Sequence, residues 1–155
     1  MSDLKIFSDN IPINGKRIIV RLDLNVPLNE SGVEDDTRIK LVEPFINKLL
    51  EKKAKVILLS HLGRPKGQVV SKLSLKPVFN FLEKKLKAKI YFYKGNIDNK
   101  AEEASNKLNP GEVLLFENIR FFKEEENNDE LFAKKLSNLG DIYINEAFSC
   151  SHRKQ

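Results

Sequence analysis

Charged and polar side chains follow several apolar runs of this 155-residue chain at the points where those runs end. Asp23 and Asn25 follow the first run, His61 and Arg64 follow the second, and Arg120 follows a later one. A guanidinium group binds phosphate or carboxylate through two parallel N–H donors. A carboxylate accepts hydrogen bonds from hydroxyl groups, and an amide both donates and accepts them. Together these residue types describe a site for a small phosphorylated hydroxy acid.

Three more basic side chains belong to the same group. Arg38 comes at the start of the helix expected after the first run, and His152 and Arg153 follow the last run. Each residue also has a structural alternative: an arginine after a strand often pairs with a local acid such as Glu117, and His61 is by itself more often a hydrogen-bonded loop residue. Independent ion pairs have no reason to gather at one edge of a fold, so the grouping favours a binding site.

The elements that must position these side chains read as strands alternating with helices. The expected strands are 17–22, 56–60, 90–93, 112–116 and 141–145. The expected helices run from 36 or 37 to 50, from 74 to 86, from 98 or 99 to 108 and from 129 to 139. Apolar strands bounded by turn residues suit a parallel sheet buried on both faces, and the connections are long enough for right-handed crossovers. The ligand of such a sheet lies beyond the carboxyl ends of its strands.

Two prolines fall inside the predicted helices. Pro44 lies within the first helix, where it lacks the N–H that the helix needs, and we expect a kink or a late start there. Pro77 falls in the first turns of the second helix, where proline is tolerated. Asp36 or Thr37 is expected to cap the first helix and Ser74 the second.

Composition indicates one soluble globular domain. The chain is 41% apolar and 32% charged, with a net charge of +5 spread over the expected helix faces. A nucleic-acid binder would concentrate this charge among aromatic residues, so no nucleic-acid partner is expected. Cys150 is the single cysteine, and no signal peptide or membrane-spanning run is recognisable. We therefore predict a cytoplasmic protein without a membrane partner.

Other chemistries have little support in the sequence. The segment 63–67 lacks the lysine followed by serine or threonine that closes a P-loop, and no G-x-G-x-x-G follows a strand. Cys150 and His152 lie too close together in one loop for a usual nucleophile and base pair. With His61 they also fall short of the ligand number of a metal site. Neither a metal nor a nucleotide is therefore expected to bind to this chain.

Six segments resemble the amino-terminal half of the phosphoglycerate kinase family, in the family's order and spacing. They are RLDLNVPL at 21–28, DDTRI at 35–39, SHLGRPKG at 60–67, SLKP at 74–77, LFENIRF at 115–121 and NEAF at 145–148, the last followed by His152 and Arg153. The resemblance covers essentially the whole chain. It implies the α/β class, with a Rossmann-like three-layer α/β/α parallel sheet that forms the amino-terminal lobe of a two-lobed kinase.

The resemblance also implies an activity and a set of site residues. The family moves a phosphoryl group reversibly between 1,3-bisphosphoglycerate and ADP, giving 3-phosphoglycerate and ATP in glycolysis and gluconeogenesis. Carried over by motif, Arg38 is the catalytic residue that reaches the transferring phosphoryl group. The implied substrate-binding residues are Asp23, Leu24, Asn25, Arg38, His61, Leu62, Gly63, Arg64, Arg120 and Arg153. Asp23 and Asn25 would hold the hydroxyl and carboxylate end of 3-phosphoglycerate, and the basic residues would surround its phosphate.

Departures from the family pattern define what this chain is expected to do alone. The chain has Glu146 and Ser149 where the family commonly has aspartate and glycine, which affects the loop that carries Arg153. Residues 1–155 are expected to form the 3-phosphoglycerate domain, incomplete at its carboxyl end, because the chain stops in a polar loop after a strand. The lobe that holds Mg-ATP or Mg-ADP has no counterpart in the sequence, so we expect the chain to be inactive alone. We also expect the chain to be a monomer. A free-standing module that binds phosphorylated small molecules without catalysis, and a nucleic-acid binder, remain alternatives.

Overall fold

The fold was analysed in a computed structural model of the chain. The structure describes residues 12–22, 28–29, 32–33, 37–60, 74–94, 99–117, 134 and 137–146.

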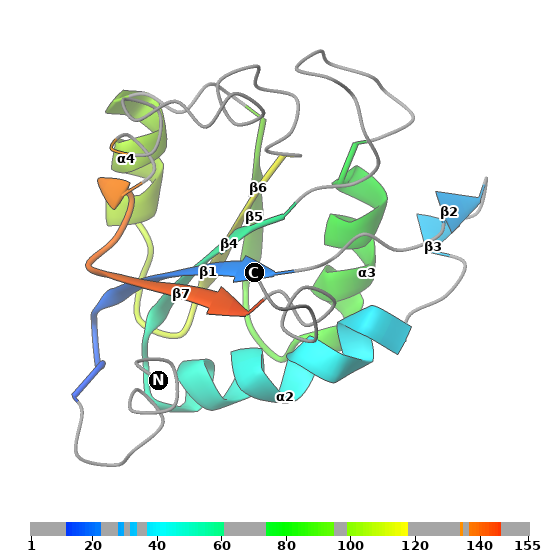
Figure 1. The fold of residues 1–155 in the computed structure, drawn as a ribbon, viewed down its shortest axis with the longest axis horizontal. Helices are drawn as coiled ribbons and strands as arrows, with labels where there is room; N and C mark the ends of the chain where they lie inside the picture. Colours follow the sequence, from blue (N-terminus) through cyan, green and yellow to red (C-terminus); the bar gives the residue numbers. More distant parts are fainter. Residues whose placement is uncertain are drawn as a thin grey trace, which may run out of the picture.

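Five parallel strands form the central sheet (Figure 1). They are β1 (Arg17–Leu22), β4 (Lys55–Leu59), β5 (Ile90–Tyr93), β6 (Val113–Phe116) and β7 (Ile142–Glu146). Their spatial order is β5-β6-β4-β1-β7, and each neighbouring pair is parallel. The α/β class and the parallel sheet are confirmed, and each predicted strand is present with its ends within one residue of the prediction.

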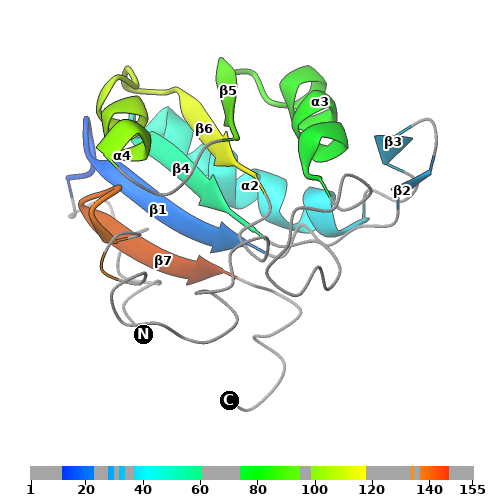
Figure 2. The same cartoon turned by 90° about the horizontal axis from the view of Figure 1, so that it is seen from above.

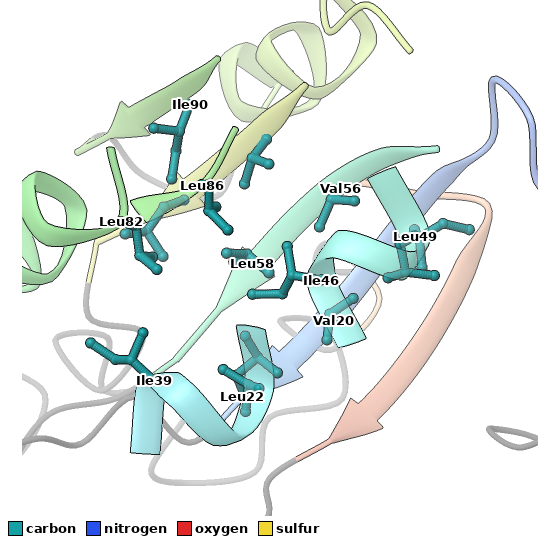
Figure 3. Close-up of a cluster of buried hydrophobic side chains, with 14 of the residues drawn as sticks. Val20, Leu22, Ile39, Ile46, Leu49, Val56, Leu58, Leu82, Leu86 and Ile90 are labelled. Carbon is teal, nitrogen blue, oxygen red and sulfur yellow. The ribbon is translucent and has the colours of Figure 1, made fainter. Parts of the chain in front are cut away.

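Helices cover both faces of the sheet, as the apolar strands require. The helices α2 (Thr37–Glu51) and α3 (Lys76–Lys85) pack on one face, and α4 (Asn99–Asn106) packs on the other (Figures 1 and 2). Alternate residues of the inner strands β1, β4 and β6 face the two core clusters, so that Ile18 belongs to the first and Ile19 to the second. Figure 3 shows the first cluster, in which Ile46 and Leu49 of α2 and Leu82 of α3 meet the strand residues. The expected three-layer arrangement is therefore confirmed.

The limits of α2 agree with the helix expected from 36 or 37 to 50, and its buried side chains share one face. Ile39 and Ile46 are fully buried, whereas Leu50 is only partly so. Pro44 lies inside the helix, which begins at Thr37, so the expected late start is wrong. Core burial on one side of α2 outweighs the backbone donor that Pro44 lacks.

The remaining predicted elements are present in part. β2 (Leu28–Asn29) pairs with β3 (Gly32–Val33) in an antiparallel arrangement, and β3 contacts α3. Of the helix predicted at 129–139, positions 134 and 137 are helical, 138 and 139 form a turn, and the other positions lie outside the described residues. Among the helices in the described ranges, none has both the length and the apolar character needed to cross a membrane.

A close contact and an ion pair hold the amino end of the sheet. A Cβ atom added to Gly140 would lie 2.6 Å from Cγ1 of Ile19 and 2.9 Å from the carbonyl oxygen of Arg17, so only glycine fits against β1 here. Asp141 accepts a hydrogen bond from the backbone N–H of Arg17 at 2.9 Å and lies 3.4 Å from its guanidinium group. These contacts fix the entry into β7 beside the start of β1.

Candidate binding site

The carboxyl ends of four neighbouring strands meet at one edge of the sheet. The arrows of β1, β4, β6 and β7 point to the same side in Figure 2. The register places Arg21 beside Leu59 of β4 and Asn145 of β7, and Leu58 beside Leu115 of β6. The segments that follow these strands therefore leave the sheet from one edge, and this edge is where a parallel sheet binds its ligand.

The predicted site residues occupy these segments in the sequence. Arg38 is the second residue of α2, and its backbone is described. The other predicted residues lie outside the described residues, so their side-chain positions stay predictions; they are Asp23, Leu24, Asn25, His61, Leu62, Gly63, Arg64, Arg120 and Arg153. Asp23 directly follows Leu22 at the end of β1, and His61 directly follows Ser60.

The connections after β4 and β6 lead to opposite faces of the sheet. After β4 the chain next reaches α3, which belongs to the first core cluster. After β6 it reaches Leu139, which belongs to the second cluster. Because β4 and β6 are neighbours, the chain separates between their ends, and this topology creates the crevice in which open α/β sheets bind ligands. The segments that begin at 61 and 118 flank this position.

Three described polar residues, Ser60, Ser74 and Glu117, lie at or next to the ends of β4 and β6, and the role of Glu117 was not predicted from the sequence. Ser60 is completely buried at the end of β4. Glu117 follows β6 and accepts hydrogen bonds from the hydroxyl of Ser74 at 2.6 Å and from the backbone N–H of Leu75 at 2.7 Å. The Ser74 hydroxyl in turn accepts from the backbone N–H of Lys76 at 3.1 Å. The sequence reading treated Glu117 only as a possible ion-pair partner of an arginine, because nothing local reveals a contact with the start of α3.

The capping prediction at α3 needs a correction. Leu75, not Ser74, occupies the position that precedes the helix, and its side chain makes no capping bond. The start of α3 is stabilised by Ser74 and, from 42 residues farther along the chain, by Glu117. Pro77 lies in the first turn, where proline was expected to be tolerated.

A largely apolar groove of about 370 Å³ lies between the outer strand β5 and α4. Tyr91, Tyr93, Lys107 and Leu108 are among its lining residues. In the described part of the chain, no group of three or more histidine, cysteine, aspartate or glutamate side chains could hold a metal ion.

Comparisons with known proteins agree with the fold and the motifs. The family model of phosphoglycerate kinase matches residues 8–155. The chain is 50% identical over 149 residues to a phosphoglycerate kinase from Sinorhizobium medicae, covering 96% of this chain and 37% of that protein. It is 48% identical over 155 residues to one from Prochlorococcus marinus, covering 99% of this chain and 39% of that protein.

Solved structures give the same answer. The phosphoglycerate kinase from Coxiella burnetii superposes with a TM-score of 0.79 at 37% identity, covering 90% of this chain and 34% of that chain. The enzyme from Pyrococcus horikoshii superposes with a TM-score of 0.80 at 30% identity, covering 95% and 38%. The chain thus spans less than two fifths of the length of these relatives. On the sequence motifs, the sheet order and these matches together, the chain belongs to the phosphoglycerate kinase family.

Proposed function

We propose that this chain forms the 3-phosphoglycerate-binding domain of a phosphoglycerate kinase, which transfers a phosphoryl group reversibly between 1,3-bisphosphoglycerate and ADP. The observation that carries the proposal is the adjacency of β6, β4, β1 and β7. Each of these strands ends at the same edge and leads into a segment that bears predicted ligands. Family membership supports the identity of the substrate.

The substrate groups match the two kinds of residue at this edge. Asp23 and Asn25, after β1, take the hydroxyl and carboxylate end of 3-phosphoglycerate. The phosphate lies among the basic residues of the loops after β4, β6 and β7, which are His61, Arg64, Arg120 and Arg153. Several guanidinium groups together hold a dianionic phosphate more tightly than one cation does. Leu24, Leu62 and Gly63 complete the loops around the bound substrate.

Arg38 stabilises the charge on the transferring phosphoryl group. It belongs to the first turn of α2, where unpaired backbone N–H groups make the helix end partly positive. Phosphoryl transfer depends mainly on positioning and on stabilising charge, so a cation at this helix end is suited to the reaction.

The nucleotide is proposed to bind outside this chain. The sequence shows neither a P-loop nor a G-x-G-x-x-G after a strand, and the family resemblance assigns the nucleotide to a second lobe. The chain's own residues therefore bind and orient the phosphoglycerate, and turnover requires a nucleotide-binding part. We propose that the chain alone is a cytoplasmic monomer that binds 3-phosphoglycerate without turning over MgATP.

The test is calorimetric titration of this chain with 3-phosphoglycerate and, separately, with MgATP. The wild-type chain is compared with Arg64→Ala and with Lys55→Ala. Both variants lose one positive charge, but Lys55 lies at the amino end of β4, opposite to the loop that carries Arg64. Loss of one phosphate-binding guanidinium is expected to weaken binding by about tenfold or more.

Saturable binding of 3-phosphoglycerate that is weakened by Arg64→Ala but unchanged by Lys55→Ala supports the proposal, provided that MgATP gives no heat. Equal losses in the two variants would indicate attraction by net charge alone. The absence of binding by a chain that circular dichroism shows to be folded would refute the proposal for this chain.

A further inference from the structure

Glu117 joins three elements that are distant in the sequence. Its backbone N–H donates to the carbonyl oxygen of Tyr93, the last residue of β5, at 2.9 Å. Its two carboxylate oxygens accept from Ser74 and Leu75 at 2.6 and 2.7 Å, immediately before α3. One residue at the end of β6 therefore fixes the start of α3 to the carboxyl edge of the sheet.

These contacts also fix the far end of the segment 61–73. That segment begins after Ser60, which is buried. Because β4 pairs with β6, Ser60 at the end of β4 lies beside the end of β6. It ends at Ser74, whose hydroxyl donates to Glu117. Both ends of the segment are thus held next to β6, and holding the ends of a loop restricts the conformations that the loop adopts.

The hydrogen bonds that the Glu117 carboxylate accepts from Ser74 and Leu75 are called the clamp below, and their setting favours strong bonds. Ser74 and Glu117 are half-buried, so water competes less with their hydrogen bonds than at an exposed site. Hydrogen bonds to an ionised acceptor are shorter and stronger than those between neutral groups, and both distances agree with this class. The same carboxylate accepts the hydrogen bond of the Leu75 N–H, at a helix start where the residue before the helix provides no side-chain acceptor.

We propose that Glu117 is a positioning residue that ties Ser74, where the segment 61–73 ends, to the start of the segment that begins at 118. The first segment carries His61 and Arg64, and the second carries Arg120. Glu117 therefore sets the spacing between basic groups that approach the substrate phosphate from two different loops. This inference rests on the proposed function for the identity of the ligand, but not for the clamp itself.

The test compares Glu117→Ala, Glu117→Gln and Glu112→Ala in this chain. The glutamine keeps one oxygen for the Leu75 N–H and places its NH₂ group toward the Ser74 hydroxyl, whereas alanine removes both contacts. Glu112 is the matched control, because its carboxylate accepts from the backbone N–H of Asn109 at 2.9 Å at the opposite end of β6. The measurements are the melting temperature, hydrogen–deuterium exchange of each segment and the dissociation constant for 3-phosphoglycerate.

Glu117→Ala is expected to speed exchange in 61–73 by about tenfold or more and to weaken 3-phosphoglycerate binding by a similar factor. Glu117→Gln should recover most of both losses. Glu112→Ala should leave both quantities within about twofold of the wild type, even where it lowers the melting temperature equally.

Two outcomes separate the clamp from the proposed function. If the wild-type chain does not bind 3-phosphoglycerate, the proposed function fails, and faster exchange in 61–73 of Glu117→Ala still supports the clamp. If exchange in 61–73 is the same in Glu117→Ala and Glu112→Ala, the inference is overturned, whatever the binding data show. Faster exchange with an unchanged dissociation constant would overturn the claim that the clamp sets the spacing of the basic groups.

Discussion

Acidic side chains at both ends of the sheet accept hydrogen bonds from backbone N–H groups. At the carboxyl edge Glu117 accepts from Leu75, and at the amino edge Asp141 accepts from Arg17. The hydrogen bond from the backbone N–H of Arg17 makes the largest contribution to lowering the pKa of Asp141 below its ordinary 3.8. Partial burial opposes this effect, and the charges of Arg17 and Lys16 add to it. A lowered pKa in the folded state makes Asp141 a source of stability at neutral pH.

The pH dependence of stability tests this role through Asp141→Asn. The stabilisation by Asp141 is fully present above its unfolded pKa of 3.8 and is lost as the pH falls through the lower folded value. Because 43% of the Asp141 side chain is exposed, the substitution is expected to cost less than about 1 kcal/mol at neutral pH. Urea denaturation at about pH 7 and about pH 3 should show that the difference between wild type and variant shrinks in acid. An equal difference at both pH values would contradict this explanation.

At the scale of single elements, α2 shows how tertiary packing overrides local preference. Its buried residues Ile39, Val42, Ile46 and Leu49 belong to the core cluster beneath one face of the sheet, and Figure 3 shows Ile39, Ile46 and Leu49 among the strand residues. Pro44 is exposed on the opposite side and provides no N–H for the carbonyl oxygen of Lys40. Proline is unfavourable at such a position by about 3 kcal/mol relative to alanine in an isolated helix. The burial of one apolar face is sufficient to keep the helix formed around it.

Pro44→Ala is therefore expected to stabilise the chain by about 1–3 kcal/mol, since it supplies the missing donor without changing the buried face. Pro77→Ala is the matched control, because Pro77 lies in the first turn of α3, where the missing N–H has no helical acceptor. Its effect should be within about 1 kcal/mol of zero or slightly destabilising. Urea denaturation of the two variants measures both free energies of unfolding. Equal stabilisation by the two substitutions would contradict the argument from helix position.

At the scale of the whole molecule, the inner strands of the sheet are buried on both faces, whereas Tyr91 and Tyr143 of the edge strands are exposed. Ile18 and Ile19 are neighbours in β1, yet they belong to different core clusters, and both are 0–1% exposed. Both isoleucines are buried because α2 and α3 cover one face of the sheet and α4 covers the other (Figures 1 and 2). A sheet with one exposed face would bury only one of the two isoleucines.

Ile18→Val and Ile19→Val test the three layers with one chemical change. Each should reduce the free energy of unfolding by about 0.5–1.5 kcal/mol, because each removes a buried methylene from a packed core. Leu41→Val provides the surface control, since Leu41 is 57% exposed, and its effect should be within about 0.5 kcal/mol of zero. Thermal or urea denaturation measures all three. A neutral result for either isoleucine variant would mean that its face of the sheet is not well packed.

The sequence by itself determined the strands, most of the helices and the set of polar residues that follow the strands. These features are local: apolar alternation and helical spacing appear in short stretches, and the polarity of a strand end can be read directly from its neighbours. For this reason β1 was predicted with its observed limits, and the limits of α2 were predicted to within one residue. The positions of nine of the predicted site residues remain predictions, because they lie outside the described residues.

Only the tertiary structure decided which strands are neighbours and which distant residues meet. β6 lies between β5 and β4, so the chain reaches the outer strand first and then returns, and no local pattern records this order. The contact of Glu117 with Ser74, and the fit of Gly140 against β1, likewise join residues far apart in the chain. Such contacts depend on the competition among all possible packings of the elements. Local sequence therefore identifies the pieces of the site, whereas long-range packing determines which of them face one another.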